Sequence, residues 1–268
     1  MARSAGLLAL DVDGTLLRSD NSLSPRNEAA IHAARDLGWH VILATGKPPW
    51  AIRDLTARLG LAGPHVVANG AGTWSGAGIR LLYELPAEAV REGLAFGKAL
   101  DVAMAVSGPA GVFCQPDWGA EQVTLSLAAV GEPAPTIISD AVAAEPHPWK
   151  VILIAATDPP RPPDLAGSRW VRTHPLFFEA VPARASKGAA LRTLSQALGL
   201  QPADVVAVGD GANDIEMLRF AGTGVAMAHA PAAVRALASV VTRSNDEDGV
   251  ALAIEPLLRR SGHGALSG

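Results

Sequence analysis

The sequence has little cysteine and no long hydrophobic run. Its one cysteine, Cys114, excludes an internal disulfide framework and any zinc site that needs several thiolates. Near the N-terminus, a run of five apolar residues ends at Asp11, whereas a secretory signal needs about 7–15 apolar residues and a membrane span about 18. Neither pattern occurs in the chain. We therefore expect a soluble protein, located in the cytoplasm, that has no membrane partner.

The chain also lacks an excess of basic residues. Its formal net charge is -4, so no overall positive field attracts nucleic acid, and we expect no nucleic-acid partner. Hydrophobic residues make up 49% of the 268 positions. That share excludes a disordered chain, and the length fits one large α/β domain or two smaller ones. A monomer and a homodimer both remain open.

The sequence does contain an alternation of short apolar runs and helical patterns. Its first part predicts buried strands at 7–10, 41–44 and 65–68, and helices at 25–37 and 50–59. The pattern returns after Ala185, with a helix capped by Ser186, strands at 205–208 and 224–227, and a helix that starts near Asn213. This order predicts an α/β fold with a Rossmann-like parallel-sheet core.

The middle of the chain differs in composition and in its predicted elements. The stretch 81–182 contains 13 of the 20 prolines. Its predicted elements are strands at 81–85, 102–106 and 151–155, a helix at 86–100 and a proline-rich loop at 157–168. We therefore predict a core domain of residues 1–80 and 183–268, split by an inserted α+β domain at 81–182.

Reactive side chains follow the predicted parallel strands. Asp11 and Asp13 come after the first strand, Thr45 after the second and Asp210 after a later one, and ligands bind at this edge of an open parallel sheet. Alternation along a strand predicts that Asp11 and Asp13 point the same way. Neighbouring carboxylates repel unless a cation lies between them or one takes a proton, so these residues with Asp210 suit Mg²⁺. Taken singly, each motif also fits a turn or a helix cap.

Four motifs occur in a fixed order: Asp11-Val12-Asp13-Gly14-Thr15, Ala44-Thr45-Gly46, Ser186-Lys187-Gly188 and Gly209-Asp210-Gly211-Ala212-Asn213-Asp214. This ordered set resembles the haloacid dehalogenase superfamily of phosphohydrolases. Three further matches resemble its Cof-like sugar-phosphatase branch: Val67-Ala68-Asn69-Gly70-Ala71, Gly224-Val225-Ala226-Met227 and Ser244-Asn245-Asp246-Glu247-Asp248-Gly249-Val250. The resemblance covers about residues 5–80 and 183–255. It implies an α/β cap, inserted between the second and third motifs, that selects the substrate.

The resemblance also implies a role for each motif residue. Asp11 is expected to attack phosphorus and form an aspartyl-phosphate, and Asp13 to act as general acid and base. The implied cofactor is Mg²⁺, held by Asp11, the main-chain carbonyl of Asp13, and Asp210. The implied donors to the phosphoryl oxygens are Thr45, the Gly46 N–H, Lys187 and Asn213. Asp214 is expected to orient Lys187 or a metal-bound water. Small phosphorylated metabolites, sugar phosphates first, are the expected substrates.

Some positions depart from the family pattern. Lys47 stands where the branch has arginine, which puts recognition of the leaving group in doubt because lysine cannot bind in a bidentate way. His229 stands where the branch often has asparagine, and we expect it to pack or to cap a helix. In the insertion, we expect Trp149 and Phe178 to pack in the core and Lys150 to be exposed.

Other functions remain as alternatives. A sugar phosphomutase of the same fold would use the same motifs, and no feature of the sequence separates it from a phosphatase. A non-catalytic protein that binds a nucleotide or another phosphorylated metabolite is the second alternative. Gly70 and Gly72 hint at a dinucleotide fingerprint, but the third glycine falls one place late, at Gly76. Dehalogenation is disfavoured, because a metal site built on Asp13 and Asp210 serves a phosphate rather than a halide.

Overall fold

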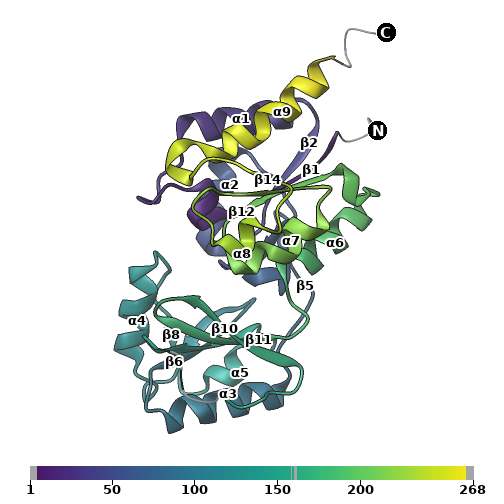
Figure 1. The fold of residues 1–268 in the computed structure, drawn as a ribbon. Helices are drawn as coiled ribbons and strands as arrows, with labels where there is room; N and C mark the ends of the chain where they lie inside the picture. The colour runs from purple at the N-terminus through teal and green to yellow at the C-terminus, as the bar shows by residue number, and fades with distance from the viewer. Residues whose placement is uncertain (1–4, 158, 160–161, 264–268) are drawn as a thin grey trace. The chain divides into compact units, whose positions relative to one another are not determined.

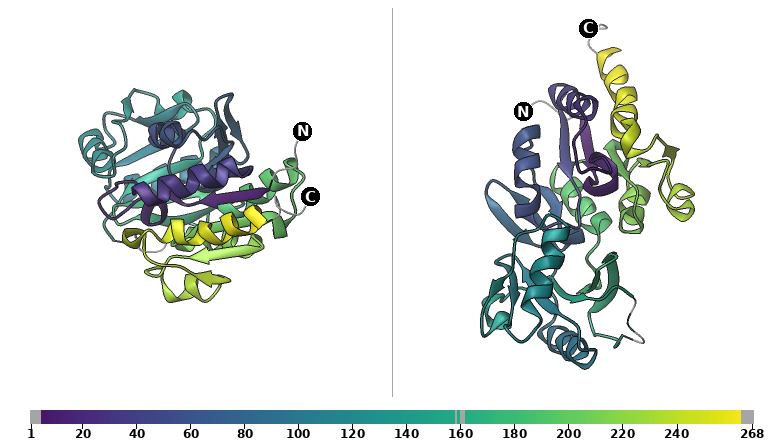
Figure 2. Two further views of the ribbon diagram at one scale, coloured as in Figure 1. Left: turned by 90° about the horizontal axis from the view of Figure 1, so that it is seen from above. Right: turned by 90° about the vertical axis from the view of Figure 1, so that its left-hand side faces the viewer.

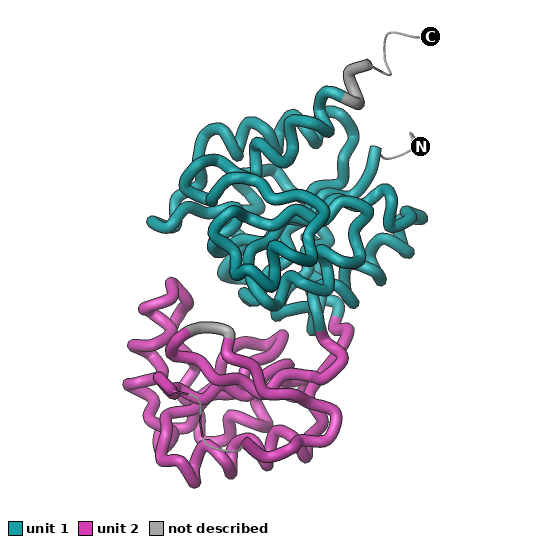
Figure 3. Tube along the Cα trace, viewed as in Figure 1, with its two compact units in different colours: residues 1–80, 186–268 teal, residues 81–185 magenta. Residues whose placement is uncertain are grey.

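The structure is a computed structural model that describes residues 5–157, 159 and 162–263. It divides into two compact units (Figure 3). Unit 1 comprises residues 1–80 and 186–268, and unit 2 comprises residues 81–185. Within the described residues, no helix is both long enough and apolar enough to cross a membrane.

Unit 1 is built on a five-stranded sheet whose paired strands run parallel, in the order β14-β13-β12-β1-β2 (Figure 1). Its strands are β1 (Gly6–Leu10), β2 (Trp39–Leu43), β12 (Val205–Gly209), β13 (Thr223–Ala226) and β14 (Val240–Val241). All residues of β1 and β12 are buried, as expected where helices cover both faces of a parallel sheet. The predicted α/β fold with a parallel-sheet core is confirmed.

The helices of unit 1 are α1 (Pro25–Asp36), α2 (Pro49–Leu59), α6 (Lys187–Ala197), α7 (Ile215–Phe220), α8 (Ala232–Arg235) and α9 (Gly249–His263). The first and last of them, α1 and α9, lie side by side on one face of the sheet (Figures 1 and 2). There Ile31 of α1 and Ile254 of α9 join Leu8 of β1 in one buried cluster. Helix α1 starts as predicted, because the Ser24 hydroxyl accepts a hydrogen bond from the Asn27 N–H.

The third predicted strand does not join the parallel sheet as expected. Strand β3 (His65–Val67) belongs to a separate three-stranded sheet with β4 (Gly72–Ser75) and β5 (Gly78–Leu81). It touches the end of β2 through a short bridge, where the Thr45 N–H donates to the Val66 carbonyl and the Leu43 N–H donates to His65 Nδ1. The chain then reverses direction through Ala68 and Asn69, both with positive φ. Strand β3 therefore pairs in antiparallel fashion with β4, the strand that follows it.

Unit 2 contains a six-stranded sheet in the order β10-β11-β9-β6-β7-β8. Its strands are β6 (Met104–Gly108), β7 (Gly111–Cys114), β8 (Thr136–Ile137), β9 (Lys150–Ile154), β10 (Ser168–His174) and β11 (Phe177–Pro182), and its helices are α3 (Ala87–Ala99), α4 (Ala120–Ala129) and α5 (Ala141–Ala144). Helix α3 packs against β9 and β11, and α4 packs against β6 and β9. The insertion is therefore α+β, as predicted.

The strands predicted for unit 2 need correction in two places. The strand predicted at 81–85 is absent beyond Leu81, where β5 ends, and the Leu85 N–H donates to the Pro148 carbonyl from an irregular segment. The sequence also did not predict β10 and β11, which follow the proline-rich loop. Residues 158, 160 and 161 of that loop lie outside the described residues, and its other members before Ser168 form no helix.

Lys150 is buried, contrary to the expectation that it is exposed. Its side chain is only 11% exposed, and its Nζ lies 3.0 Å from Glu179 Oε1. The reason is its place in the sheet: β9 lies between β6 and β11, so even its first residue is covered and meets a carboxylate from the neighbouring strand. Trp149 and Phe178 are buried, as expected for core packing, and Phe178 stacks on Trp170.

Candidate active site

The first motif forms a tight turn at the end of β1. Asp11 follows the strand directly and is buried, and its N–H donates to the Val208 carbonyl of β12. Residues 12–16 then curl back on themselves, with Gly14 at φ +75°. A Cβ at Gly14 would lie 2.7 Å from Asp210 Oδ2, so only glycine allows this close approach.

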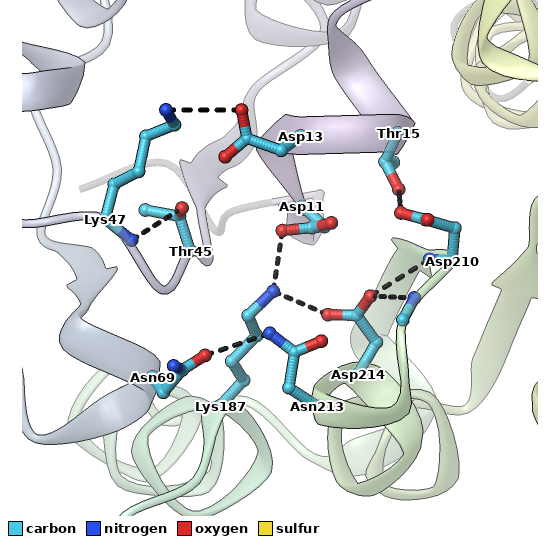
Figure 4. Close-up of polar contacts among 11 residues, drawn as sticks. Asp11, Asp13, Thr15, Thr45, Lys47, Asn69, Lys187, Asp210, Asn213 and Asp214 are labelled. Carbon is cyan, nitrogen blue, oxygen red and sulfur yellow. Dashed lines mark hydrogen bonds and ion pairs between the residues drawn. The ribbon is translucent and has the colours of Figure 1, made fainter. Parts of the chain in front are cut away.

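The turn changes the predicted relation between Asp11 and Asp13. Strand alternation stops at Leu10, where β1 ends, so it does not place the two side chains. Asp11 is buried against Lys187, whereas the Asp13 side chain is 50% exposed and meets Lys47 (Figure 4). The two carboxylates are close in the chain but have different partners and different contact with water.

Asp210 and Asp214 follow β12 in a second turn. The Asp210 carboxylate is held by Thr15, whose Oγ1 donates to Asp210 Oδ1 at 2.7 Å. Asp214 is fully buried, and its Oδ2 accepts from the main-chain N–H groups of Asp210 and Gly211 at 2.9 and 2.8 Å. A Cβ at Gly209 would lie 2.6 Å from Asp214 Cγ. The absence of a side chain at Gly209 thus makes room for Asp214.

Lys187 enters the site from the first turn of α6. Ser186 caps this helix by accepting from the Ala189 N–H at 3.0 Å, and its hydroxyl donates to Glu216 Oε2 of α7 at 2.5 Å. Gly188 packs directly on the Glu216 backbone, where a Cβ would lie 2.5 Å from the carbonyl carbon. This docking of α6 on α7 fixes the direction of Lys187.

The ammonium of Lys187 bridges two carboxylates (Figure 4). Its Nζ lies 2.6 Å from Asp11 Oδ1 and 2.7 Å from Asp214 Oδ1, and its side chain is 1% exposed. Residues from the turn after β1, from α6 and from the turn after β12 therefore meet in one buried group. Asp214 contacts Lys187, one of the two roles that the resemblance implied for it.

Thr45 and its neighbours form the next part of the site. The Thr45 Oγ1 accepts from the Lys47 N–H at 3.0 Å, which leaves the Thr45 hydroxyl proton for a further acceptor. The Asn69 N–H donates to the Thr45 carbonyl at 3.0 Å. Asn69 Oδ1 accepts from Asn213 Nδ2 at 2.9 Å, so the two motifs are joined by an amide pair (Figure 4).

The site carries more negative than positive charge. Burial raises the pKa of Asp11 to about 6, with Lys187 lowering it and Asp210 raising it. Burial followed by the charge of Asp11 raises the pKa of Asp214, also to about 6. For Lys187, burial would lower the pKa, but the charges of Asp11 and Asp214 outweigh burial and raise it. One ammonium therefore does not balance the carboxylates around it.

This excess of negative charge fits a bound cation. Carboxylate oxygens of Asp11, Asp210 and Asp214 lie within 4.8 Å of one another. Both oxygens of Asp214 already accept hydrogen bonds, from Lys187 and from two backbone N–H groups. Asp11 and Asp210 are therefore the better candidates to hold a metal ion, and hard oxygen ligands suit Mg²⁺.

Two residues of the site, Thr15 and Asn69, were not assigned a role from the sequence, and a third, His229, was given only a structural one. Thr15 and Asn69 lie inside quoted motifs, and the signal that could have identified them is their position beside the assigned residues. His229 was expected to pack or to cap a helix, but its side chain is 37% exposed and its Nε2 lies 3.6 Å from Asp210 Oδ2. The N-cap residue of helix α8 is Pro231, so His229 does not occupy the cap position that was one of the two expectations for it.

Known proteins share both the sequence and the fold. The family model described as haloacid dehalogenase-like hydrolase matches residues 8–254. The chain belongs to the haloacid dehalogenase-like hydrolase family. The match confirms the resemblance to this family that was proposed from the motifs.

Individual relatives of this hydrolase include several phosphatases. The putative phosphatase YxeH of Bacillus subtilis (strain 168) is 32% identical over 276 residues, which covers 94% of this chain and 98% of YxeH. The 5-amino-6-(5-phospho-D-ribitylamino)uracil phosphatase YcsE of the same organism is 30% identical over 255 residues, covering 92% and 94%. A haloacid dehalogenase-like hydrolase from Bacteroides thetaiotaomicron is similar in structure, with a TM-score of 0.81, 26% identity and coverage of 94% and 99%. These likenesses confirm the predicted enzyme class, a phosphatase of this family.

Proposed function

We propose that this hydrolase is a Mg²⁺-dependent phosphatase that removes phosphate from small metabolites, sugar phosphates first, through a phosphorylated Asp11. The observation that carries the proposal is the bridge of Lys187 between Asp11 and Asp214 at the strand ends, beside Asp210. A buried carboxylate held 2.6 Å from an ammonium is oriented as a nucleophile.

The proposed reaction has two steps. In the first, an oxygen of Asp11 forms a bond to phosphorus, the ester P–O bond breaks, and the leaving oxygen takes a proton from Asp13. In the second, water attacks phosphorus, Asp13 takes its proton, and the bond between Asp11 and phosphorus breaks. Asp13 suits both roles because its side chain is 50% exposed and can exchange protons with water.

The phosphoryl oxygens would be held by groups from three motifs. Thr45 offers a hydroxyl proton, Gly46 its main-chain N–H, Asn213 its amide and Lys187 its charge. Asp11, the Asp13 carbonyl and Asp210 would hold the metal ion. When bound, Mg²⁺ supplies positive charge that offsets the repulsion between the attacking carboxylate and the phosphate.

We assign the choice of substrate to unit 2. The unit 1 residues described above account for phosphate binding, proton transfer and the metal, and none of them distinguishes one ester from another. A substrate with a small polar body is supported by the name of the relative YcsE, which acts on a phosphorylated ribityl compound. The fold alone does not separate a phosphatase from a phosphomutase.

The test is hydrolysis of p-nitrophenyl phosphate with Mg²⁺ and with EDTA, by the wild-type chain and by Asp11→Asn. Turnover that needs Mg²⁺ and is abolished in Asp11→Asn supports the proposal. The matched control is Asp54→Asn, an exposed aspartate on α2, which should retain wild-type turnover. Turnover that survives in Asp11→Asn would overturn the assignment of the nucleophile. Activity that requires an added sugar bisphosphate would identify a mutase instead.

A further inference from the structure

We propose that Lys47 is a positioning residue for Asp13, and that its ammonium holds the Asp13 carboxyl group where, when protonated, it can give its proton to the leaving group. This inference rests on the proposed phosphatase function. In this inference Lys47 acts through Asp13, the proton-transfer residue, and does not itself recognise the leaving group.

The first observation is the isolation of Asp13. Lys47 Nζ lies 3.3 Å from Asp13 Oδ1, with side-chain exposures of 21% and 50% (Figure 4). Within the part of the chain that the structure describes, the Asp13 carboxylate has no other side-chain partner. The neighbouring acids differ, because Asp11 is held by Lys187 and Asp210 by Thr15. Without Lys47, the half-exposed carboxylate of Asp13 would turn among its staggered rotamers.

The second observation is the anchoring of Lys47 itself. Its N–H donates to Thr45 Oγ1 at 3.0 Å, and its carbonyl accepts from the Ala68 N–H at 3.0 Å. Pro48 and Pro49 follow directly, and their rings restrict the backbone. The ammonium therefore extends from a fixed base, which is the condition for one side chain to orient another.

The third point concerns the type of cation. A lysine ammonium is a compact point charge, whereas an arginine guanidinium grips both oxygens of a carboxylate. The ion pair of Lys47 is made with Asp13 Oδ1. The other oxygen remains available to exchange a proton with the leaving group and, later, with water. Lysine at this position can thus orient Asp13 through one oxygen and leave the second free.

The consequence depends on the leaving group. When the P–O bond breaks, a strongly basic leaving oxygen needs the proton of Asp13, whereas the weakly basic p-nitrophenolate departs without much help. A residue that acts through Asp13 therefore affects the two kinds of ester unequally. A residue that binds the phosphate directly affects both alike.

The experiment compares phenyl phosphate with p-nitrophenyl phosphate, two esters of similar shape whose leaving groups differ in basicity. Kinetics are measured with Mg²⁺ for the wild-type chain, Lys47→Met, Lys47→Arg and the control Lys98→Met, an exposed lysine on α3. We expect Lys47→Met to lower kcat/KM for phenyl phosphate by about 10- to 100-fold and for p-nitrophenyl phosphate by less than about 3-fold. Lys47→Arg should restore part of the loss, and Lys98→Met should match the wild type.

A second measurement separates positioning from binding. Inorganic phosphate is used as a competitive inhibitor, and its inhibition constant should change by less than about 2-fold in Lys47→Met, because Lys47 is not assigned to the phosphate. Equal losses for the two esters, or a large rise in that inhibition constant, would overturn the inference and leave the phosphatase function standing. If the wild-type chain hydrolyses neither ester, the proposed function fails and this inference fails with it.

Discussion

Unit 1 and unit 2 each bury a lysine, and their surroundings differ. Lys187 lies between two carboxylates, with a third nearby, at the ends of parallel strands. Lys150 lies on a strand inside an antiparallel part of the sheet and forms an ion pair with Glu179, and the charge of Glu132 also acts to raise its pKa. Both ammonium groups keep a raised pKa although burial acts to lower it. Burial of a lysine therefore does not by itself distinguish the two sites.

What distinguishes the two sites is the balance of charge. The Lys150–Glu179 pair is neutral as a whole, which suits a structural contact. Around Lys187 the carboxylates outnumber the ammonium, and the pKa of both Asp11 and Asp214 is raised to about 6. A site with unmatched negative charge can take a cation, whereas a matched pair cannot.

His65 extends the comparison to a buried base that has no carboxylate partner among the described contacts. It is 1% exposed, and its Nδ1 accepts from the Leu43 N–H. Burial lowers its pKa to about 4. Among the described residues, Lys187 has two ion-paired carboxylates, Lys150 has one and His65 has none. The comparison shows that nearby acids decide whether burial lowers the pKa of a base.

The largest effect should come from removing the lysine of the unbalanced site. In the proposed mechanism Lys187 orients Asp11 and binds the phosphate, so for Lys187→Met we expect kcat/KM for p-nitrophenyl phosphate to fall by about 10⁴-fold. Lys150→Met is the matched control, and its turnover per folded molecule should stay within about 3-fold of the wild type. Similar losses in both variants would break the distinction between the two lysines.

Lys150 should matter for stability although it is expected to matter little for turnover. Lys150→Met leaves the Glu179 carboxylate buried without its cation, and we expect a loss of about 4 kcal/mol in the free energy of unfolding. The double variant Lys150→Met with Glu179→Leu removes both charges and should recover most of this loss. Urea unfolding measures both. A loss below about 1 kcal/mol in the single variant would show that the pair is not a structural contact.

His65 should make stability depend on pH. Its pKa is 6.5 in the unfolded chain and about 4 in the folded one, so between these values only the unfolded chain binds the proton. Its contribution is complete above pH 6.5 and is lost as the pH falls toward 4, by about 3 kcal/mol in total. The raised pKa of Asp11 and Asp214 gives the opposite slope below pH 6, where falling pH favours the folded state.

The His65 contribution is isolated by comparing the wild type with His65→Asn in urea unfolding between pH 4 and 7. Asparagine keeps an acceptor for the Leu43 N–H but does not titrate in this range. The difference between the two chains should change by about 3 kcal/mol across the window. A constant difference would mean that His65 is protonated alike in both states.

The smallest effect is expected at His229, whose side chain is partly exposed beside Asp210. His229→Asn should change the free energy of unfolding by less than about 0.5 kcal/mol. The Mg²⁺ concentration for half-maximal activity should change by less than about 3-fold. A larger shift in the Mg²⁺ titration would show that His229 contributes to the metal site, and its charge would then have to be counted with those of the carboxylates.

Sequence reasoning succeeded where local pattern and burial agree. The strands β1, β2, β12 and β13 were predicted because buried parallel strands are continuous apolar runs. Strands β10 and β11 were missed, because Arg169, Arg172 and Glu179 interrupt their apolar pattern. Glu179 is nevertheless buried. Its partner Lys150 is distant in the sequence, and a pattern read along the chain does not reveal such a pair.

The same limit applies within the site. The sequence motifs identified Asp11, Lys187 and Asp210 in order, but not which side chains pair. The contacts of Lys47 with Asp13, Asn69 with Asn213 and Thr15 with Asp210 join residues that are 34 or more positions apart. Such contacts depend on how strand ends and helix starts meet in space.

The sequence by itself determined the α/β class, the family and the order of the reactive residues, because short-range patterns and motif residues carry this information. The tertiary structure decided the electrostatics. It placed Lys187 between two carboxylates, buried Lys150 against Glu179 and left Asp13 with Lys47 alone among the described side chains. The physical reason is that charge balance and burial depend on distances across the fold, and those distances exist only once the strands and helices have packed.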